Sequence, residues 1–537
     1  MKKLTSKKYL INSIFILSTI LFFFGACNPH KNEKYQINES IDINEIDIVK
    51  LKSGYAKGDF TIKEITQIYL ERINQLDFNG PELGSIIQIN PDAIKVAVKL
   101  DKEMDSGNDR GPLHGIPIVL KDNINTDDNM YTTAGSRALK KSKPGRDSYV
   151  ARKLREAGAV IIAKANLSEW ANFRGQKSSS GWSGVNGQTK NPYVLTRNPC
   201  GSSSGSGVAV SANLTVLAIG TETNGSIVCP SSANGIVGIK PTVGLISRSG
   251  IIPISFTQDT PGPMARTLTD AVIALGTLTG VDSSDSKTFT SKGKFLEDYT
   301  PFLKINGIKN KRIGLFTAPL GKNKKVDSLV MKSVRILQER GADIIEIDEI
   351  APLETGKNSF QVMLFEYKDG LNKYFSSLGQ DAHIKDIEDL IKFNEQDSIE
   401  LKYFNQAYLE MAQEKSGLDS KEYINALSNL KRMSQNLGID RVMDENLLDA
   451  IIAPTGSPAW TTDWINGDNY HISSSSPAAW AGYPNISVPM GNIHGLPVGL
   501  SFFGRAWSEP TLIEICYGFE QATKARITPT FRINDEK

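Results

Sequence analysis

Residues 177–263 constrain the fold more than any other part of the sequence. They are rich in glycine, serine, proline and asparagine and carry few charges, a composition also typical of flexible linkers. Apolar runs interrupt the segment at 208–210, 214–219 and 236–239. A linker would not carry such runs, and the glycines between them allow backbones to approach closely. The segment therefore predicts buried elements whose main chain supplies polar contacts to a site.

Helix and strand patterns alternate along the rest of the chain. Residues 43–76 predict two helices, and Thr61 and Glu64 form a capping box at the start of the second. This alternation indicates an α/β fold, a central mixed β-sheet covered by helices on both faces. Strands are expected at 116–120, 159–163, 448–453, 483–490 and 498–503, and helices at 147–156 and 508–522. Residues 354–445 are charged and helical, and we interpret them as a substrate-side helical insertion.

The N-terminus has the pattern of an export signal. Four lysines in the first eight residues precede a mostly apolar stretch at 10–24, which is short for a spanning helix. We predict a signal peptide over residues 1–26, the alternative being a signal anchor that stays in the membrane. Cys27 follows Phe-Gly-Ala, which resembles a bacterial lipoprotein signal with Phe24 in place of the usual leucine.

Cleavage before Cys27 would leave an acylated cysteine that anchors the chain to a membrane. Residues 27–42 then predict a polar, lipid-anchored tether, and residues 43–537 the folded domain. Asn28 is not the aspartate that resembles an inner-membrane retention signal. We therefore expect an exported lipoprotein on the outer membrane, facing the periplasm or the cell surface.

The remaining cysteines, Cys200, Cys229 and Cys516, are too few for a disulfide framework. Cys200 and Cys229 flank two serine motifs and could approach each other, but we predict small buried thiols. The 61 basic and 59 acidic residues nearly cancel, which argues against a nucleic-acid partner. No cluster has metal-ligand spacing, so we expect neither a metal nor another cofactor.

Three segments carry residues suited to catalysis. Residues 115–121 place Lys121 at the end of an apolar strand, where burial would turn a cation into a neutral base; such a lysine is more often a surface charge. The Gly-Ser-rich residues 201–207 suit a loop or a phosphate cradle, without the ending of a nucleotide loop. In residues 220–230, Ser226 follows Asn-Gly, where a tight turn can aim successive N–H groups at one point.

Together these segments closely resemble the amidase signature family of serine hydrolases. The resemblance spans residues 43–527 and is densest over 111–271. It includes Gly-Pro-Leu-His-Gly-Ile-Pro at 111–117, Lys-Ala-Asn-Leu-Ser-Glu-Trp at 164–170, Gly-Ile-Lys-Pro-Thr at 238–242 and Asp-Thr-Pro-Gly-Pro-Met-Ala-Arg at 259–266.

The resemblance implies a Ser-Ser-Lys relay. Ser226 matches the nucleophile, Ser202 the bridging serine, held in the family by a cis peptide, and Lys121 the base. Neutral Lys121 would accept a proton from Ser202, which takes one from Ser226 as that oxygen attacks an amide carbonyl. Ser203 matches a position that supports the network by hydrogen bonding. The family's oxyanion hole corresponds to the backbone N–H groups of Thr223, Asn224, Gly225 and Ser226.

Glu222, Asn224 and Val228 stand where the family often has Asp, Gly and Arg. This variant is similar to the peptide amidase branch, which hydrolyses C-terminal carboxamides, and residues 365–368 and 386–394 also look like that branch. The implied substrate is a peptide or small-molecule amide, cleaved to a carboxylate and ammonia. We expect residues 354–445 and 457–480 to wall its pocket.

Three alternatives remain. A Ser-His-Asp hydrolase would need a catalytic histidine such as His114. Under this alternative, replacement of His114 by alanine would abolish turnover. An amidotransferase component of the glutamyl-tRNA type shares the fold and the relay, but an export signal is hard to reconcile with its cytoplasmic role. A non-catalytic, lipid-anchored binding protein has no support in the sequence, because all three relay residues are present.

Overall fold

The computed structural model describes residues 41–380 and 382–534. The predicted signal peptide 1–26, Cys27 and the tether as far as residue 40 lie outside the described residues. Within the described part, no helix is both long and apolar enough to cross a membrane.

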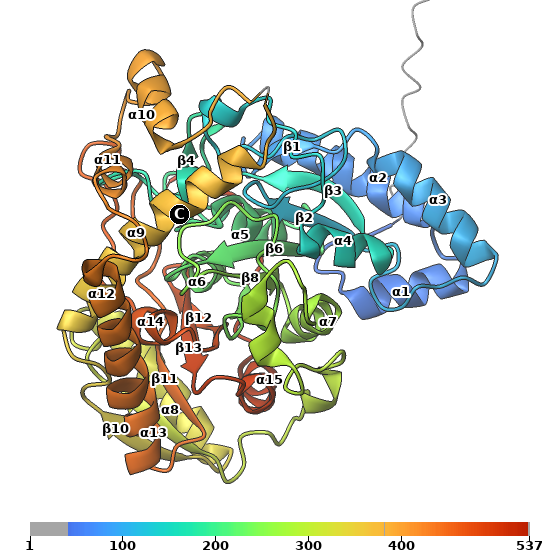
Figure 1. Ribbon diagram of the computed structural model, residues 1–537. Helices are drawn as coiled ribbons and strands as arrows, with labels where there is room; N and C mark the ends of the chain where they lie inside the picture. The colour runs from blue at the N-terminus through green and yellow to red at the C-terminus, as the bar shows by residue number, and fades with distance from the viewer. Residues whose placement is uncertain (1–40, 381, 535–537) are drawn as a thin grey trace, which may run out of the picture. The chain divides into compact units, whose positions relative to one another are not determined.

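An eleven-stranded mixed sheet forms the centre of the described domain (Figure 1). Its order is β1-β3-β2-β6-β8-β7-β12-β13-β11-β9-β10. β2 runs parallel to β3 and β6, whereas β6 and β8 are antiparallel. The bounds are β1 Ile86–Ile89, β2 Pro117–Lys121, β3 Val160–Ala165, β6 Leu217–Glu222, β7 Val237–Lys240, β8 Thr260–Ala265, β9 Arg312–Phe316, β10 Asp343–Ile347, β11 Ala450–Pro454, β12 Asn485–Ile493 and β13 Leu496–Phe503.

Helices cover both faces of this sheet, as the sequence predicts. The predicted N-terminal pair is present, and the capping box forms at the start of α2, with both Thr61 and Glu64 hydrogen bonded to the backbone. A small hairpin of β4 (Trp182–Ser183) and β5 (Gly187–Gln188) lies outside the sheet. The helices are α1 Ile48–Lys57, α2 Ile62–Ile73, α3 Ala93–Asp105, α4 Tyr149–Glu156, α5 Ser204–Ser211, α6 Val228–Ala233, α7 Leu268–Leu278, α8 Lys324–Glu339, α14 Ser476–Ala481 and α15 Glu509–Thr523.

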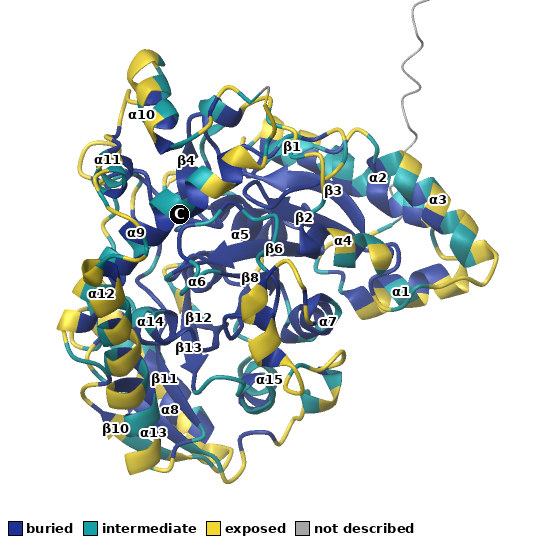
Figure 2. Ribbon diagram, viewed as in Figure 1, coloured by how far each residue is buried: buried dark blue, intermediate teal, exposed yellow. Residues whose placement is uncertain are grey.

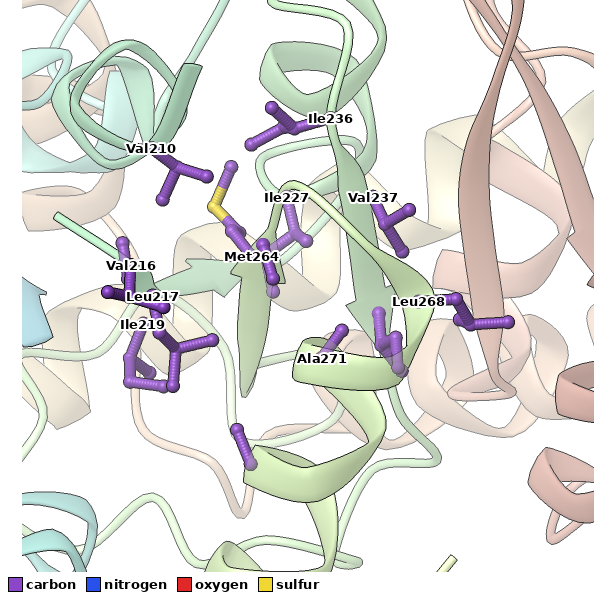
Figure 3. Close-up of a cluster of buried hydrophobic side chains, with 14 of the residues drawn as sticks. Val210, Val216, Leu217, Ile219, Ile227, Ile236, Val237, Met264, Leu268 and Ala271 are labelled. Atoms are coloured by element: carbon purple, nitrogen blue, oxygen red, sulfur yellow. The ribbon is translucent and has the colours of Figure 1, made fainter. Parts of the chain in front are cut away.

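The main core lies between the sheet and these helices. Figure 2 shows the central strands buried and the exposed residues on the outer faces of the helices. Figure 3 shows one part of the core, where side chains from α5, α7 and the strands gather around Met264. Met264, Val210 and Ile219 are all fully buried. Burial on this scale is the main force that holds the sheet and its helices together.

The glycine-rich segment is part of this core, as predicted, and supplies α5, β6, α6, β7 and β8. Its first helix begins at Ser204, inside the Gly-Ser run that could also have been a loop. A Cβ at Gly205 would lie 2.2 Å from the carbonyl oxygen of Ser85 and 2.5 Å from that of Asn166. Only glycine fits such an approach, which brings α5 against the chain that flanks β3.

The helical insertion lies in sequence between β10 and β11, along the left of the view in Figure 1. It packs on the core through aromatic side chains, and the rings of Trp170 and Phe375 meet edge to face at 6.1 Å. Its longest helix, α9, therefore lies against the chain that follows β3. The helices are α9 Glu354–Ser376, α10 Ile387–Gln396, α11 Ala407–Gln413, α12 Lys421–Lys431 and α13 Asp440–Glu445, with a π-helical turn at Arg432–Ile439.

Candidate active site

Lys121 is the last residue of β2 and is fully buried. Its Nζ lies 2.7 Å from Ser202 Oγ, 2.9 Å from Thr221 Oγ1 and 3.1 Å from the carbonyl oxygen of Thr221. Because β6 is the parallel neighbour of β2, the end of one strand delivers the lysine and the end of the other delivers Thr221. Among the described residues, the side chain is thus held by uncharged oxygens and forms no ion pair.

This setting changes the charge of Lys121. Burial lowers its pKa from 10.5 to about 7, against the opposing influence of Asp259 and Glu222. An amine with such a pKa is substantially neutral at physiological pH. It can then donate to Thr221 and present its lone pair to the hydroxyl of Ser202.

The pH dependence of turnover is expected to follow this lysine. Below its pKa of about 7, Lys121 is a cation and cannot accept a proton, so activity is lost as pH falls and is regained as pH rises. We expect the pH profile of kcat/KM for an amide to have an acidic limb, on which kcat/KM falls about tenfold for each pH unit below the pKa of Lys121. A pH profile of ammonia release measures it, and constant kcat/KM from pH 5 to pH 8 would contradict a lysine base.

Ser202 and Ser203 lie immediately before α5, and the Gly201–Ser202 peptide bond is cis, as the resemblance implies. Ser203 is held by Thr221, whose N–H donates to Ser203 Oγ and whose carbonyl oxygen accepts from it. The N–H of Ser203 donates to the carbonyl oxygen of Ser226 at 3.1 Å. Ser203 therefore connects β6 and the segment of Ser202 to residues 223–227, the loop that carries Ser226 and is called the nucleophile loop below.

Ser226 lies between β6 and α6, with 9% of its surface exposed. Its Oγ forms no hydrogen bond with the described residues, so the Lys121–Ser202 link of the predicted relay is made and the Ser202–Ser226 link is not. Such links are often loose in a site without substrate and shorten when substrate binds. The Ser203–Ser226 backbone bond nevertheless keeps the two serine segments adjacent.

The loop before Ser226 corrects one part of the predicted oxyanion hole. The Glu222 carboxylate accepts from the N–H groups of Gly225, Ile227 and Val228 at 2.8, 2.8 and 3.0 Å. The N–H of Gly225 is therefore committed to the protein itself. Within the described chain, the N–H groups of Thr223, Asn224 and Ser226 donate no hydrogen bond, and they remain the candidates for an oxyanion.

Three residues to which the sequence analysis assigned no catalytic or supporting role complete the site. Thr221 holds the base, Glu222 staples the nucleophile loop, and Asp259 accepts a hydrogen bond from Thr223 Oγ1 at 2.6 Å. The sequence offered a weak signal for two of them, since Thr221 and Glu222 are polar residues that end an apolar strand. Asp259 opens the Asp-Thr-Pro-Gly motif, but its partner is fixed only by the tertiary fold.

His114 is used elsewhere. It is fully buried, its Nδ1 accepts from the N–H of Arg110 at 3.2 Å, and its Nε2 lies 3.0 Å from the carbonyl oxygen of Leu100. Both ring nitrogens are thus occupied by backbone groups. A Ser-His-Asp arrangement built on this histidine is not present.

Cys200 and Cys229 form a disulfide, which corrects the prediction of two free thiols. Their Cα atoms are 6.0 Å apart, within the usual range for a bridge. The physical reason is the contact between Ser203 and Ser226, which brings residues on either side of the two motifs together. Cys516 is a free, buried thiol.

This bridge is expected to stabilise the domain. It closes a loop across a sequence separation of 29 residues, and the loss of that constraint should lower the free energy of unfolding by about 3.5 kcal/mol. Urea unfolding of a Cys200→Ser/Cys229→Ser variant measures the loss, and a reductant should lower the unfolding midpoint of the wild type but not that of the double variant. Cys516→Ala is the control, which should keep its sensitivity to reductant.

A cavity of about 270 Å³ borders the network on the side of Thr221 and Thr223. Its apolar wall is formed by residues 251–254 and Phe256, and α9 contributes Tyr374. Ser226 does not line it, and neither do residues 457–480. Those residues approach the nucleophile loop instead, where Ser475 Oγ donates to Asn224 Oδ1 at 2.7 Å.

Known proteins resemble this chain over most of its length. The family model described as Amidase matches residues 64–513. A probable amidase of Arabidopsis thaliana is 40% identical over 508 residues, covering 92% of this chain and 93% of the relative. A glutamyl-tRNA(Gln) amidotransferase subunit of Thermoanaerobacter pseudethanolicus is 32% identical over 509 residues, covering 91% and 99%.

Solved structures extend the likeness to the fold. The native peptide amidase of Stenotrophomonas maltophilia superposes with a TM-score of 0.88 at 48% identity, covering 91% of this chain and 99% of that one. Within the described residues, no group of three or more His, Cys, Asp or Glu side chains could hold a metal ion. The chain therefore belongs to the amidase signature family and is a hydrolase that acts on amides.

Proposed function

We propose that this protein hydrolyses the C-terminal carboxamide of peptides, or a similar small amide, through Ser226, Ser202 and Lys121. The observation that carries the mechanism is the buried, unpaired Lys121 held 2.7 Å from Ser202 Oγ. A lysine buried without a carboxylate partner is costly unless it is neutral, and a neutral amine is a base.

The reaction follows from that base. Lys121 accepts the proton of Ser202, Ser202 accepts the proton of Ser226, and Ser226 Oγ bonds to the amide carbon. The oxyanion is held by the free N–H groups of Thr223, Asn224 and Ser226. The relay then returns a proton to the leaving nitrogen, ammonia departs, and an acyl-enzyme remains. Water activated by the same relay releases the carboxylate and regenerates the hydroxyl of Ser226.

Several features support a peptide amide as the substrate. The peptide amidase is 48% identical to this chain, whereas the amidotransferase relative is 32% identical. Glu222 and Val228 follow the peptide amidase variant of the motif. The apolar cavity beside Thr223 offers space for a side chain on the acyl side of the scissile bond.

Ammonia release from a panel of amides tests this proposal. The panel contains short peptide amides, the same peptides with free carboxylates, an aliphatic amide, an aryl amide and glutamine. We expect kcat/KM for the peptide amides to exceed that for the others by about tenfold or more, with no cleavage of the free peptides. A preference for aryl or aliphatic amides would overturn the substrate class but leave the relay intact.

We also propose that the chain is exported and anchored through an acylated Cys27. The lysine-rich start, the apolar stretch and the Phe-Gly-Ala before Cys27 support this, although these residues lie outside the described part. Mass spectrometry of the mature N-terminus tests it, and any terminus other than acylated Cys27 contradicts it. Cys27→Ser should release the protein from the membrane fraction.

A further inference from the structure

Asp259 holds the loop that precedes the nucleophile. Its Oδ1 accepts from Thr223 Oγ1 at 2.6 Å, and its Oδ2 accepts from the N–H groups of Ile254 and Ser255 at 2.7 and 2.9 Å. One carboxylate thus joins the nucleophile loop to the turn at 254–255. Ile254 and Ser255 also line the cavity, so this carboxylate fixes the cavity wall relative to the loop.

The neighbouring residue reinforces the same contact. Gln258 Nε2 donates to the carbonyl oxygen of Thr223 at 3.4 Å, and its Oε1 accepts from Ser359 Oγ of α9 at 2.7 Å. Glu366, also on α9, accepts from Ser255 Oγ and from the N–H of Thr257 at 2.5 and 3.0 Å. The helical insertion is therefore linked to Thr223 through a short chain of polar contacts.

Asp259 also acts on Lys121 through its charge. It is the larger of the two opposing influences on the pKa of Lys121, the other being Glu222. Burial raises the pKa of Asp259 itself to about 6, against its hydrogen bond from Thr223 and the positive charge of Arg248. Arg248 is in turn paired with Asp285. Glu222 accepts from the N–H groups of Gly225 and Ile227, whereas Asp259 reaches the loop through the hydroxyl of Thr223.

We propose that Asp259 is a positioning residue for this reaction, which holds the nucleophile loop through the hydroxyl of Thr223 and fixes the cavity wall at Ile254 and Ser255 relative to that loop. The inference rests on the proposed Ser-Ser-Lys relay. The effect of Asp259 on loop geometry and the effect of its charge on Lys121 are separable, because the hydroxyl of Thr223 transmits only the first. Removal of that hydroxyl should slow turnover without changing the charge near Lys121.

The test is kcat/KM against pH for the full chain and two variants, with a peptide amide as the substrate. Asp259→Asn should lower the plateau on the order of tenfold to a hundredfold and move the acidic limb about one unit toward lower pH. The sign follows because removal of an anion favours the neutral amine. Thr223→Val should lower the plateau and leave the limb in place.

The outcomes separate this inference from the proposed function. An Asp259→Asn enzyme with the wild-type plateau and limb overturns the inference, and so does a Thr223→Val enzyme with the wild-type plateau, even where Asp259→Asn fails to fold. A wild type without an acidic limb overturns the lysine relay instead. Asp270→Asn, a buried carboxylate on α7 that accepts from the N–H of Ile48, is the matched control and should keep the limb.

Discussion

Replacement of Ser226 by alanine is expected to abolish amide hydrolysis while the protein stays folded. Loss of a nucleophile in a serine relay removes the whole covalent route, so kcat should fall by at least about 10³-fold. Ser226 Oγ forms no hydrogen bond with the described part of the chain, so alanine removes no hydrogen bond within that part. The thermal midpoint should therefore remain at the wild-type value, and ammonia release with a thermal melt measures both.

Ser231 provides a control substitution that distinguishes loss of the nucleophile from a general effect of serine replacement near the site. Ser231 lies in α6, one turn beyond Ser226, and its Oγ donates to the carbonyl oxygen of Ile227 at 2.7 Å. Ser231→Ala should keep turnover within a few-fold. A fluorophosphonate probe should label Ser226 in the wild type and in Ser231→Ala, but not in Ser226→Ala. If the Ser226→Ala variant were still labelled and still hydrolysed the amide, another residue would be the nucleophile.

The strands, and the position of Lys121 at the end of one of them, were predictable because their signals are local. The apolar run before Lys121 ends at the residue that leaves the strand, and the structure places β2 at Pro117–Lys121. Hydrophobic periodicity likewise located α2 and its capping box. The helical insertion at 354–445 followed from charged residues at helical spacing.

Long-range contacts account for what the sequence could not supply. The helix propensity of Ser-Gly-Ser-Gly is low, and α5 depends on tertiary packing, in which Gly205 approaches the carbonyl oxygens of Ser85 and Asn166 and Val208 and Val210 are buried. The pairing of Cys200 with Cys229 depends on the contact between Ser203 and Ser226. No local sequence pattern predicts such a long-range contact.

The nucleophile loop shows the same limit at the scale of single hydrogen bonds. The letters Asn-Gly-Ser indicate a tight turn, and Gly225 does adopt a φ of 86°. The Glu222 carboxylate determines which backbone N–H groups of the turn remain free. It accepts from the N–H of Gly225, which is therefore not free. The family motif therefore predicts a turn before Ser226 but not which of its N–H groups are already hydrogen bonded within the protein.

Replacement of Lys121 by methionine should lower kcat by about 10³-fold or more and remove the acidic limb near pH 7. Methionine fills a similar volume without a basic nitrogen, so Ser202 loses its proton acceptor. The residual activity should no longer follow the titration of an amine. Arginine is unsuitable as a replacement, because a guanidinium stays charged and cannot serve as a base. The pH profile of ammonia release measures both effects.

Lys240 is the matched control for this change. It is also fully buried, burial lowers its pKa to about 8, and its Nζ donates to the carbonyl oxygens of Tyr483 and Pro241 at 2.6 and 3.1 Å. Lys240→Met leaves those carbonyls unpaired, so the free energy of unfolding should fall by about 1–3 kcal/mol. Its turnover and acidic limb should remain, because its amine contacts neither serine. If both methionine variants lost the limb alike, a shared effect of buried lysines on folding would replace Lys121 as the explanation.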